Sequence, residues 1–120
     1  MSVNSVNKVI LVGRLGQDPD VKTSQAGKKI VSFSMATSDS WKDKETGERQ
    51  EKTYWHKIVI FNDGLAGIAE SYLKKGSLVY IEGALQTRDY EKNGSKIHIT
   101  EVVLQGFSAT LKMLDSRNNS

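Results

Sequence analysis

The sequence contains no cysteine and no long run of apolar residues. Without thiols the chain can form neither disulfides nor zinc sites with cysteine ligands, and it has no thiolate nucleophile. The longest apolar run, Val9 to Val12, is far shorter than the ~20 residues of a membrane-spanning helix. The first residues, MSVNSVNKV, also lack the basic and apolar regions of a signal peptide. These absences predict a globular protein of the cytosol or of an organelle matrix.

Motifs of catalysis are absent as well. The sequence has no G-x-x-x-x-G-K-[ST] phosphate loop, no G-x-G-x-x-G and no G-x-S-x-G. Its two histidines, His56 and His98, do not have the H-E-x-x-H spacing, so we expect them at packed or subunit surfaces rather than at a metal. The carboxylates are spread among lysines and arginines, as in residues 42–45, which is typical of a solvated loop. We therefore expect no enzyme activity, no metal and no cofactor.

What remains is a small, mildly basic chain. A length of 120 residues is usual for one domain and sufficient for a core without disulfides or metals. There are 17 Lys and Arg against 14 Asp and Glu, which gives a net charge of +3. This charge is compatible with a polyanionic partner but does not identify one. We expect residues 1–112 to form the domain and residues 113–120 to be a polar, disordered end.

Hydrophobic periodicity gives the order of elements. β-Branched and alternating segments predict strands at 6–15, 30–38, 53–62, 77–90 and 95–106. A helical period over 63–75, with Asn62 or Asp63 as N-cap, predicts one helix. Its expected apolar stripe consists of Leu65, Ile68, Ala69, Tyr72 and Leu73. The charged stretch 39–52 is expected to be a long flexible hairpin loop.

Two glycines add detail to this order of strands and helix. Gly83 inside the strand 77–90 indicates a bulge or a sharp bend, and Asn93-Gly94 indicates a hairpin turn. A single helix between the third and fourth of five long strands predicts a mainly β fold, the five-stranded Greek-key barrel called the OB-fold. Such barrels bind oligonucleotides or oligosaccharides, so the fold alone does not fix the ligand.

The strand 53–62 combines aromatic and basic residues. Alternation places two sets on opposite faces: Trp55, Lys57, Val59 and Phe61 on one, and Tyr54, His56, Ile58 and Ile60, the expected core, on the other. Aromatics beside cations are typical of single-stranded nucleic-acid binding, where bases stack on rings and Lys or Arg contact phosphates. Trp41 and Tyr90 lie where loops could present them. The pattern leaves three alternatives: nucleic-acid binding, structural packing, or a sugar or peptide ligand.

Several long motifs resemble those of the bacterial single-stranded DNA-binding protein family. They are VNKVILVGRLGQDPDV (6–21), the stretch from Ser40-Trp41 through the charged loop, TYWHKIVIFN (53–62) and YLKKGSLVYIEGALQTRDY (72–90). The likeness extends from about Val3 to about Leu114, and mitochondrial members are similar too. The resemblance implies a homotetramer of OB-folds that wraps single-stranded DNA in replication, recombination and repair. It also implies a cytoplasmic, nucleoid-associated protein, with the mitochondrial matrix as the alternative.

The resemblance further implies roles for particular residues. The stacking aromatics of the family match Trp41, Trp55, Phe61 and Tyr90. The phosphate-binding cations match Lys8, Arg14, Lys44, Lys57, Lys74, Lys75 and Arg88, and a tetramer-supporting histidine matches His56. Tyr90 stands where many members have tryptophan, and Arg14 where some have a neutral residue. The family's acidic C-terminal tip, which recruits replication and repair proteins, is absent from this sequence: either the sequence is the DNA-binding domain of a longer protein, or this member lacks the recruiting tail. In both cases we expect these residues to bind DNA without docking those partners.

Three other hypotheses stay open at this level. An OB-fold replication accessory could bind DNA chiefly by charge, but the four matching aromatics disfavour it. A small enzyme acting on nucleic acid is disfavoured by the lack of a metal-ligand cluster and of a phosphate loop. A structural tetramer would bury the same aromatics in subunit contacts. Because stacking neither needs nor forbids a 2′-hydroxyl, RNA remains a conceivable second ligand.

Overall fold

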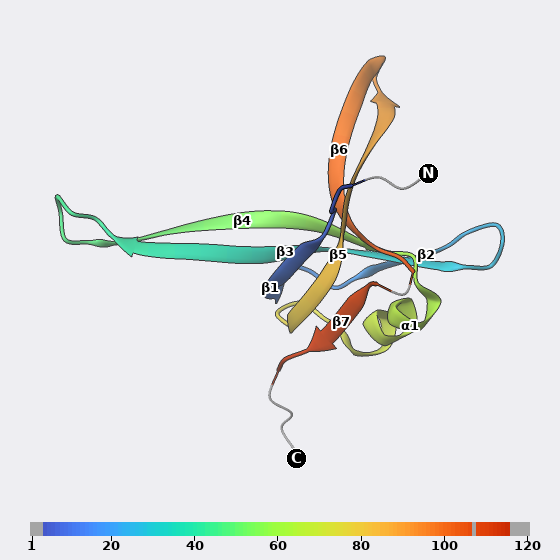
Figure 1. The fold of residues 1–120 in the computed structure, drawn as a ribbon, viewed down its shortest axis with the longest axis horizontal. Helices are drawn as coiled ribbons and strands as arrows, with labels where there is room; N and C mark the ends of the chain where they lie inside the picture. Colours follow the sequence, from blue (N-terminus) through green and yellow to red (C-terminus); the bar gives the residue numbers. More distant parts are fainter. Residues whose placement is uncertain (1–3, 107, 116–120) are drawn as a thin grey trace.

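The computed structural model describes residues 4–106 and 108–115. Within these residues the chain is mainly β, with one helix (Figure 1). The elements are β1 (Val9–Leu15), β2 (Asp20–Thr23), β3 (Lys29–Lys42), β4 (Arg49–Ile60), α1 (Asp63–Tyr72), β5 (Leu78–Lys92), β6 (Ser95–Leu104) and β7 (Thr110–Met113). Two hairpin arms, β3–β4 and β5–β6, extend away from a central body in different directions.

Strand pairing closes the central body into a barrel. β1 pairs with β5 along most of its length and with β3 at its end, and β3 pairs with β4. β4 then pairs in parallel with β6, and β6 pairs with β5, which returns to β1. The circle β1–β3–β4–β6–β5 is the five-stranded OB-fold barrel, so the predicted fold, with its single helix between the third and fourth barrel strands, is confirmed.

Two glycines allow the long strands to change partners. A Cβ on Gly83 would lie 2.6 Å from the Val103 carbonyl oxygen, at the point where β5 leaves β1 and begins to pair with β6. A Cβ on Gly13 would lie 2.2 Å from the Ala36 carbonyl oxygen, where β1 reaches β3. Neither contact tolerates a side chain, because the opposing atom is backbone. β5 thus changes partner at Gly83, the position where the sequence predicts a bulge or a sharp bend.

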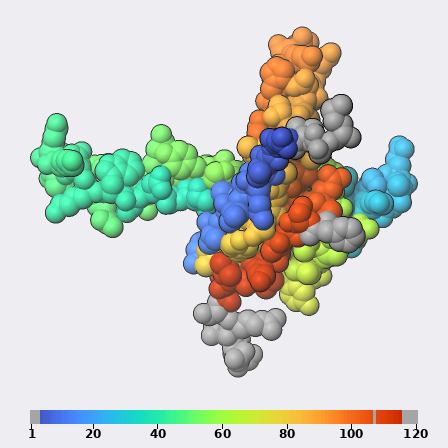
Figure 2. Space-filling model, viewed as in Figure 1, coloured from blue at the N-terminus to red at the C-terminus, as the bar shows by residue number. Residues whose placement is uncertain are grey.

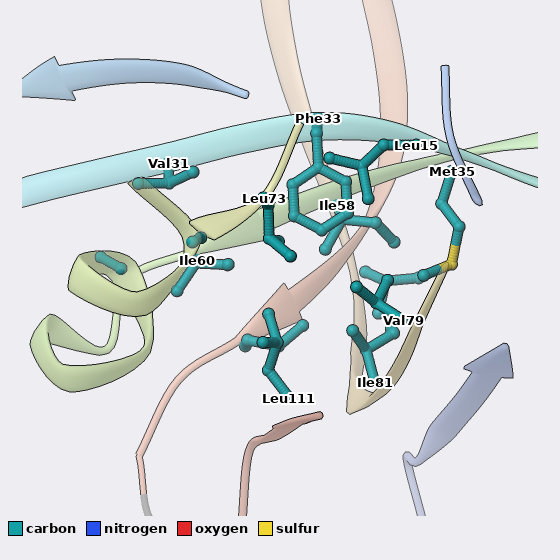
Figure 3. Close-up of a cluster of buried hydrophobic side chains, with 14 residues drawn as sticks. Leu15, Val31, Phe33, Met35, Ile58, Ile60, Leu73, Val79, Ile81 and Leu111 are labelled. Atoms are coloured by element: carbon teal, nitrogen blue, oxygen red, sulfur yellow. The ribbon is translucent and has the colours of Figure 1, made fainter. Parts of the chain in front are cut away.

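The barrel interior is filled by alternating residues of its strands (Figure 3). Val31, Phe33 and Met35 of β3 are buried, as their alternation with Ser32, Ser34 and Ala36 predicts. α1 closes one end of the barrel, and its N-cap is Asn62, whose side chain accepts a hydrogen bond from the Leu65 N–H at 3.1 Å.

The inward face of α1 differs from the predicted stripe. Ala66, Ala69 and Leu73 are buried, whereas Ile68 and Tyr72 remain exposed. Small residues let the helix approach β3 and β4 closely, so the contact side is rotated toward the alanines. The larger apolar side chains at the margins then point outward.

The charged stretch 39–52 is not a flexible loop. β3 and β4 remain paired from Val31↔Ile60 to Lys42↔Arg49, so the stretch forms the outer half of an arm with a short turn at its tip. In that turn the Asp43 carboxylate accepts a hydrogen bond from the Glu45 N–H at 2.8 Å, and Gly47 has φ of 74°. The charge content of a segment does not show whether the segment pairs with another strand. Pairing between β3 and β4 makes this stretch part of the sheet.

The chain also forms a strand after residue 106, where the sequence predicts none. β7 pairs with β5 in the register Ile81↔Leu111, and Leu111 joins the buried cluster. The predicted domain end at residue 112 thus falls inside β7. Of the predicted disordered end, residues 116–120 lie outside the described residues.

Candidate nucleic-acid interface

The outer face of β4, β6 and β5 gathers five of the predicted DNA-binding residues. Because Ile58 and Ile60 point into the core, alternation turns the neighbouring β4 residues outward. The parallel register Val59↔Val103 continues this face onto β6, and the antiparallel register of β5 and β6 continues it onto β5. We call this surface the outer face; its predicted DNA-binding residues are Trp55, Lys57, Phe61, Arg88 and Tyr90.

A groove of about 320 Å³ crosses the outer face. Its floor is apolar, since Val59 and Val103 are 7% and 3% exposed, and Phe61 borders it with 39% of its surface exposed. Lys57 also lines the groove. An apolar floor with an aromatic and a cation beside it is suited to a flat base attached to a phosphate.

Trp55 is the most exposed aromatic of the outer face, at 61%. Its ring lies against Gly16, where an added Cβ would be 2.4 Å from the ring atom Cζ3. Gln17 and Ser34 complete a hollow of about 330 Å³ beside the ring. Glycine at position 16 therefore gives the indole room to lie at the end of β1 while most of its surface stays open.

Arg88 and Tyr90 are coupled to a buried carboxylate. The Arg88 Nε and Nη2 atoms donate to Glu101 Oε1 and Oε2 at 2.9 and 3.3 Å, and the Glu101 side chain is only 5% exposed. This hydrogen bonding raises the pKa of Arg88 above its usual value. The guanidinium carbon also lies 5.7 Å from the Tyr90 ring centroid. Sequence reasoning missed Glu101, because only the β5–β6 register brings its carboxylate to Arg88.

Trp41 lies away from the outer face, on the β3–β4 arm. It is 48% exposed and is paired with Gln50 near the arm's tip. The register places it on the ribbon side of Tyr54 and His56, opposite to that of Trp55. Because two-stranded ribbons twist strongly, the direction of each side changes along the arm.

The expected core set of β4 is only half buried. Tyr54 is 43% exposed, with the Lys52 ammonium 5.3 Å from its ring centroid, and so its predicted core position is wrong. His56 is half-buried and its Nε2 is hydrogen-bonded to Thr37 Oγ1 at 2.8 Å. The reason is that β4 is longer than the barrel, so its first half continues into the arm beyond the core.

The predicted phosphate-binding cations fall into two groups. Lys8 pairs with Glu82 at 3.1 Å, and Arg14 pairs with Asp115 at 3.6 Å. Arg88 pairs with Glu101, as above. The remaining cations form no ion pair within residues 4–106 and 108–115: Lys44 at the arm's tip, Lys57 in the groove, and Lys74 and Lys75 between α1 and β5.

Figure 2 shows the β3–β4 and β5–β6 arms as separate projections from the central body. In the described part of the chain, no group of three or more His, Cys, Asp or Glu side chains could hold a metal ion. No helix among the same residues is long and apolar enough to cross a membrane.

Comparisons with known proteins, by sequence and by structure, point to the same family. The model of the single-strand binding protein family matches residues 6–114. A single-stranded DNA-binding protein of Rickettsia felis is 51% identical over 117 residues, which cover 97% of this chain and 77% of the relative. One of Rhizobium meliloti is 53% identical over 114 residues, covering 94% and 66% respectively.

Solved structures give the same result. A Plasmodium falciparum SSB in complex with single-stranded DNA superposes with a TM-score of 0.86 at 38% identity, covering 96% of this chain and all of that one. A deletion mutant of the Thermus aquaticus single-stranded DNA binding protein superposes with a TM-score of 0.73 at 29% identity, covering 93% and 52%. With its barrel, its exposed aromatics and this similarity over nearly its whole length, the chain belongs to the single-strand binding protein family.

Proposed function

We propose that the chain binds single-stranded DNA without sequence preference, in replication, recombination and repair. The observation that carries this proposal is the outer face, where Trp55, Phe61 and Tyr90 are 61%, 39% and 40% exposed and Lys57 lines a groove together with Phe61. Large aromatic surface is rarely left in water without a ligand. The similar Plasmodium falciparum structure, whose title names single-stranded DNA, supports the same ligand.

The mechanism is binding without catalysis. Bases stack on the exposed rings, and each stacked base contributes about 1–3 kcal/mol. Every base has a π-face, so stacking tolerates any sequence. Lys57, Lys44, Lys74 and Lys75 neutralise phosphates and release counterions, so affinity falls as salt rises. In duplex DNA the bases are stacked on each other, and this makes the duplex a poor ligand.

We further propose that the chain assembles as a homotetramer with other copies of itself. β1 pairs with β3 only at Arg14 and Leu15, so within the described residues its edge from Val9 to Val12 is open on that side. Ile10 and Val12 are 55% and 48% exposed there. An open strand edge with apolar side chains is suited to pairing with a second copy. A tetramer lets one DNA strand engage several outer faces, which raises the overall affinity.

His56 and the cellular location complete the proposal. The half-buried ring of His56, held by Thr37, borders the arm and suits a subunit contact. We place the protein in the cytoplasm with the DNA, because its relatives are bacterial proteins named for binding single-stranded DNA. Gel filtration with light scattering tests the tetramer.

The two tryptophans provide the test of DNA binding. Oligothymidylate is titrated into the protein at low salt, and tryptophan fluorescence is followed before salt is added in steps. We expect strong quenching that salt partly reverses, and little response to a duplex of equal length. Absence of quenching would contradict the proposal, because Trp41 and Trp55 would then not contact bases. Incubation of single strands with Mg²⁺ tests the enzyme alternative: the strands should remain intact.

A further inference from the structure

A buried carboxylate lies in the middle of the outer face. Glu101, on β6, is 4% exposed and borders the groove that also holds Lys57 and Phe61. A negative charge here faces the phosphates of any bound strand, and a buried carboxylate is destabilising unless it is fully paired. Arg88 satisfies it with two hydrogen bonds, one to each oxygen. Arg88 and Glu101 therefore form a neutral pair within this surface, and Arg88 is not a free cation of a basic patch.

The charge of Arg88 is already compensated. A phosphate that approaches its guanidinium also approaches the Glu101 carboxylate, whose Oε1 lies 2.9 Å from Nε. Such a pair attracts and releases few counterions when a strand binds. Lys57 lines the same groove and forms no ion pair within the described residues. Arg88 and Lys57 thus line the same groove but differ in charge: that of Arg88 is compensated by Glu101, and that of Lys57 has no ion-pair partner within the described residues.

The orientation of Arg88 serves a second purpose. Bidentate hydrogen bonding fixes the planar guanidinium, and a fixed guanidinium can stack on a base or against an aromatic ring. Its carbon lies 5.7 Å from the Tyr90 ring centroid, two residues further along the same side of β5. Arg88 and Tyr90 are therefore held as neighbouring flat groups, and 59% of the Arg88 side chain remains exposed to a ligand.

We propose that Glu101 is a positioning residue that converts Arg88 from a phosphate contact into part of a stacking platform with Tyr90. The proposal rests on the proposed binding of single-stranded DNA and changes the role of one residue within it. Arg88 then contributes to affinity at all salt concentrations, while Lys57 contributes mainly at low salt. Lysine cannot replace Arg88, because an ammonium offers neither the planar group nor the two parallel hydrogen bonds.

The test measures the salt dependence of binding. An oligothymidylate of about 8 nucleotides, within the range that one OB-fold engages, is titrated at several salt concentrations. Lys57→Gln is the matched control and should reduce the slope of log affinity against log salt by about 0.7. Arg88→Lys keeps the positive charge opposite Glu101 but loses the planar group, so it should lower affinity about two- to fivefold and leave the slope unchanged.

Glu101→Gln should change the slope in the opposite direction to Lys57→Gln. It frees the charge of Arg88, so the slope should steepen by about 0.7, and the double variant Arg88→Gln/Glu101→Gln should return to the wild-type slope. The proposal is overturned if the double variant flattens the slope as Lys57→Gln does, or if Arg88→Lys binds like the wild type. If circular dichroism shows that Glu101→Gln is unfolded, Arg88→Lys and Lys57→Gln, which both keep Glu101, still decide. Failure of the wild type to bind the oligonucleotide would instead refute the proposed function.

Discussion

Replacing Trp55 by alanine removes the largest open ring of the outer face. With 61% of its surface exposed, the indole offers a broad plane to a base. Stacking contributes about 1–3 kcal/mol per base, so we expect Trp55→Ala to weaken binding by about five- to 150-fold. The fold should change little, because the ring packs on Gly16 at the barrel surface and lies outside the core. We expect a loss of about 0.5 kcal/mol or less in the free energy of unfolding.

Fluorescence anisotropy of a labelled oligothymidylate measures this affinity without depending on tryptophan signals. Tyr72→Ala is the matched control, because Tyr72 is an equally open aromatic, 58% exposed, on α1 and away from the outer face. We expect Tyr72→Ala to bind like the wild type. The stacking argument would be refuted if Trp55→Ala bound within about twofold of the wild type, or if both variants lost affinity equally.

Three further variants test the geometry, the core and the pH dependence. Gly16→Ala should displace the Trp55 ring, because the new Cβ would lie 2.4 Å from Cζ3; anisotropy should show weaker binding while the thermal midpoint stays near that of the wild type. Ile60→Ala leaves a cavity at a fully buried site, and urea titration should show a loss of about 2–5 kcal/mol. The hydrogen bond from Tyr80 lowers the pKa of Glu82 below its usual value of 4.5. Its stabilisation is therefore complete above about pH 4.5 and is lost as the pH falls through the lowered pKa, so thermal midpoints should drop in acid, and Glu82→Gln should flatten that drop.

Sequence periodicity predicted the parts of the fold that depend on neighbouring residues. The buried alternation of β3, the N-cap at Asn62 and the Asn93-Gly94 turn, with φ of 54° and 80°, are all present. Each is set by side chains or backbone preferences within a few positions along the chain. The barrel prediction followed from the order of these elements together with the glycine inside the strand 77–90, where β5 changes partner.

Features that depend on distant partners were not predictable. The arm replaced the expected loop because residues 39–42 pair with 49–52, and the exposure of Tyr54 depends on where the barrel ends along β4. Glu101 became part of the outer face only through its register with β5. β7 was missed because a single apolar residue, Leu111, anchors it in the core. Roles of the aromatics and cations in binding DNA remain predictions.

β4 has a different environment at its two ends. At Ile58–Ile60 it pairs with β3 on one side and β6 on the other, whereas from Arg49 to Lys57 its pairing is with β3. Amide hydrogens in the doubly paired part can exchange only when the barrel opens, while those of the arm can exchange by fraying from its tip. Opening from the tip would therefore release the end of the arm, which carries Trp41 on β3, while the doubly paired part at Ile58–Ile60 stays closed.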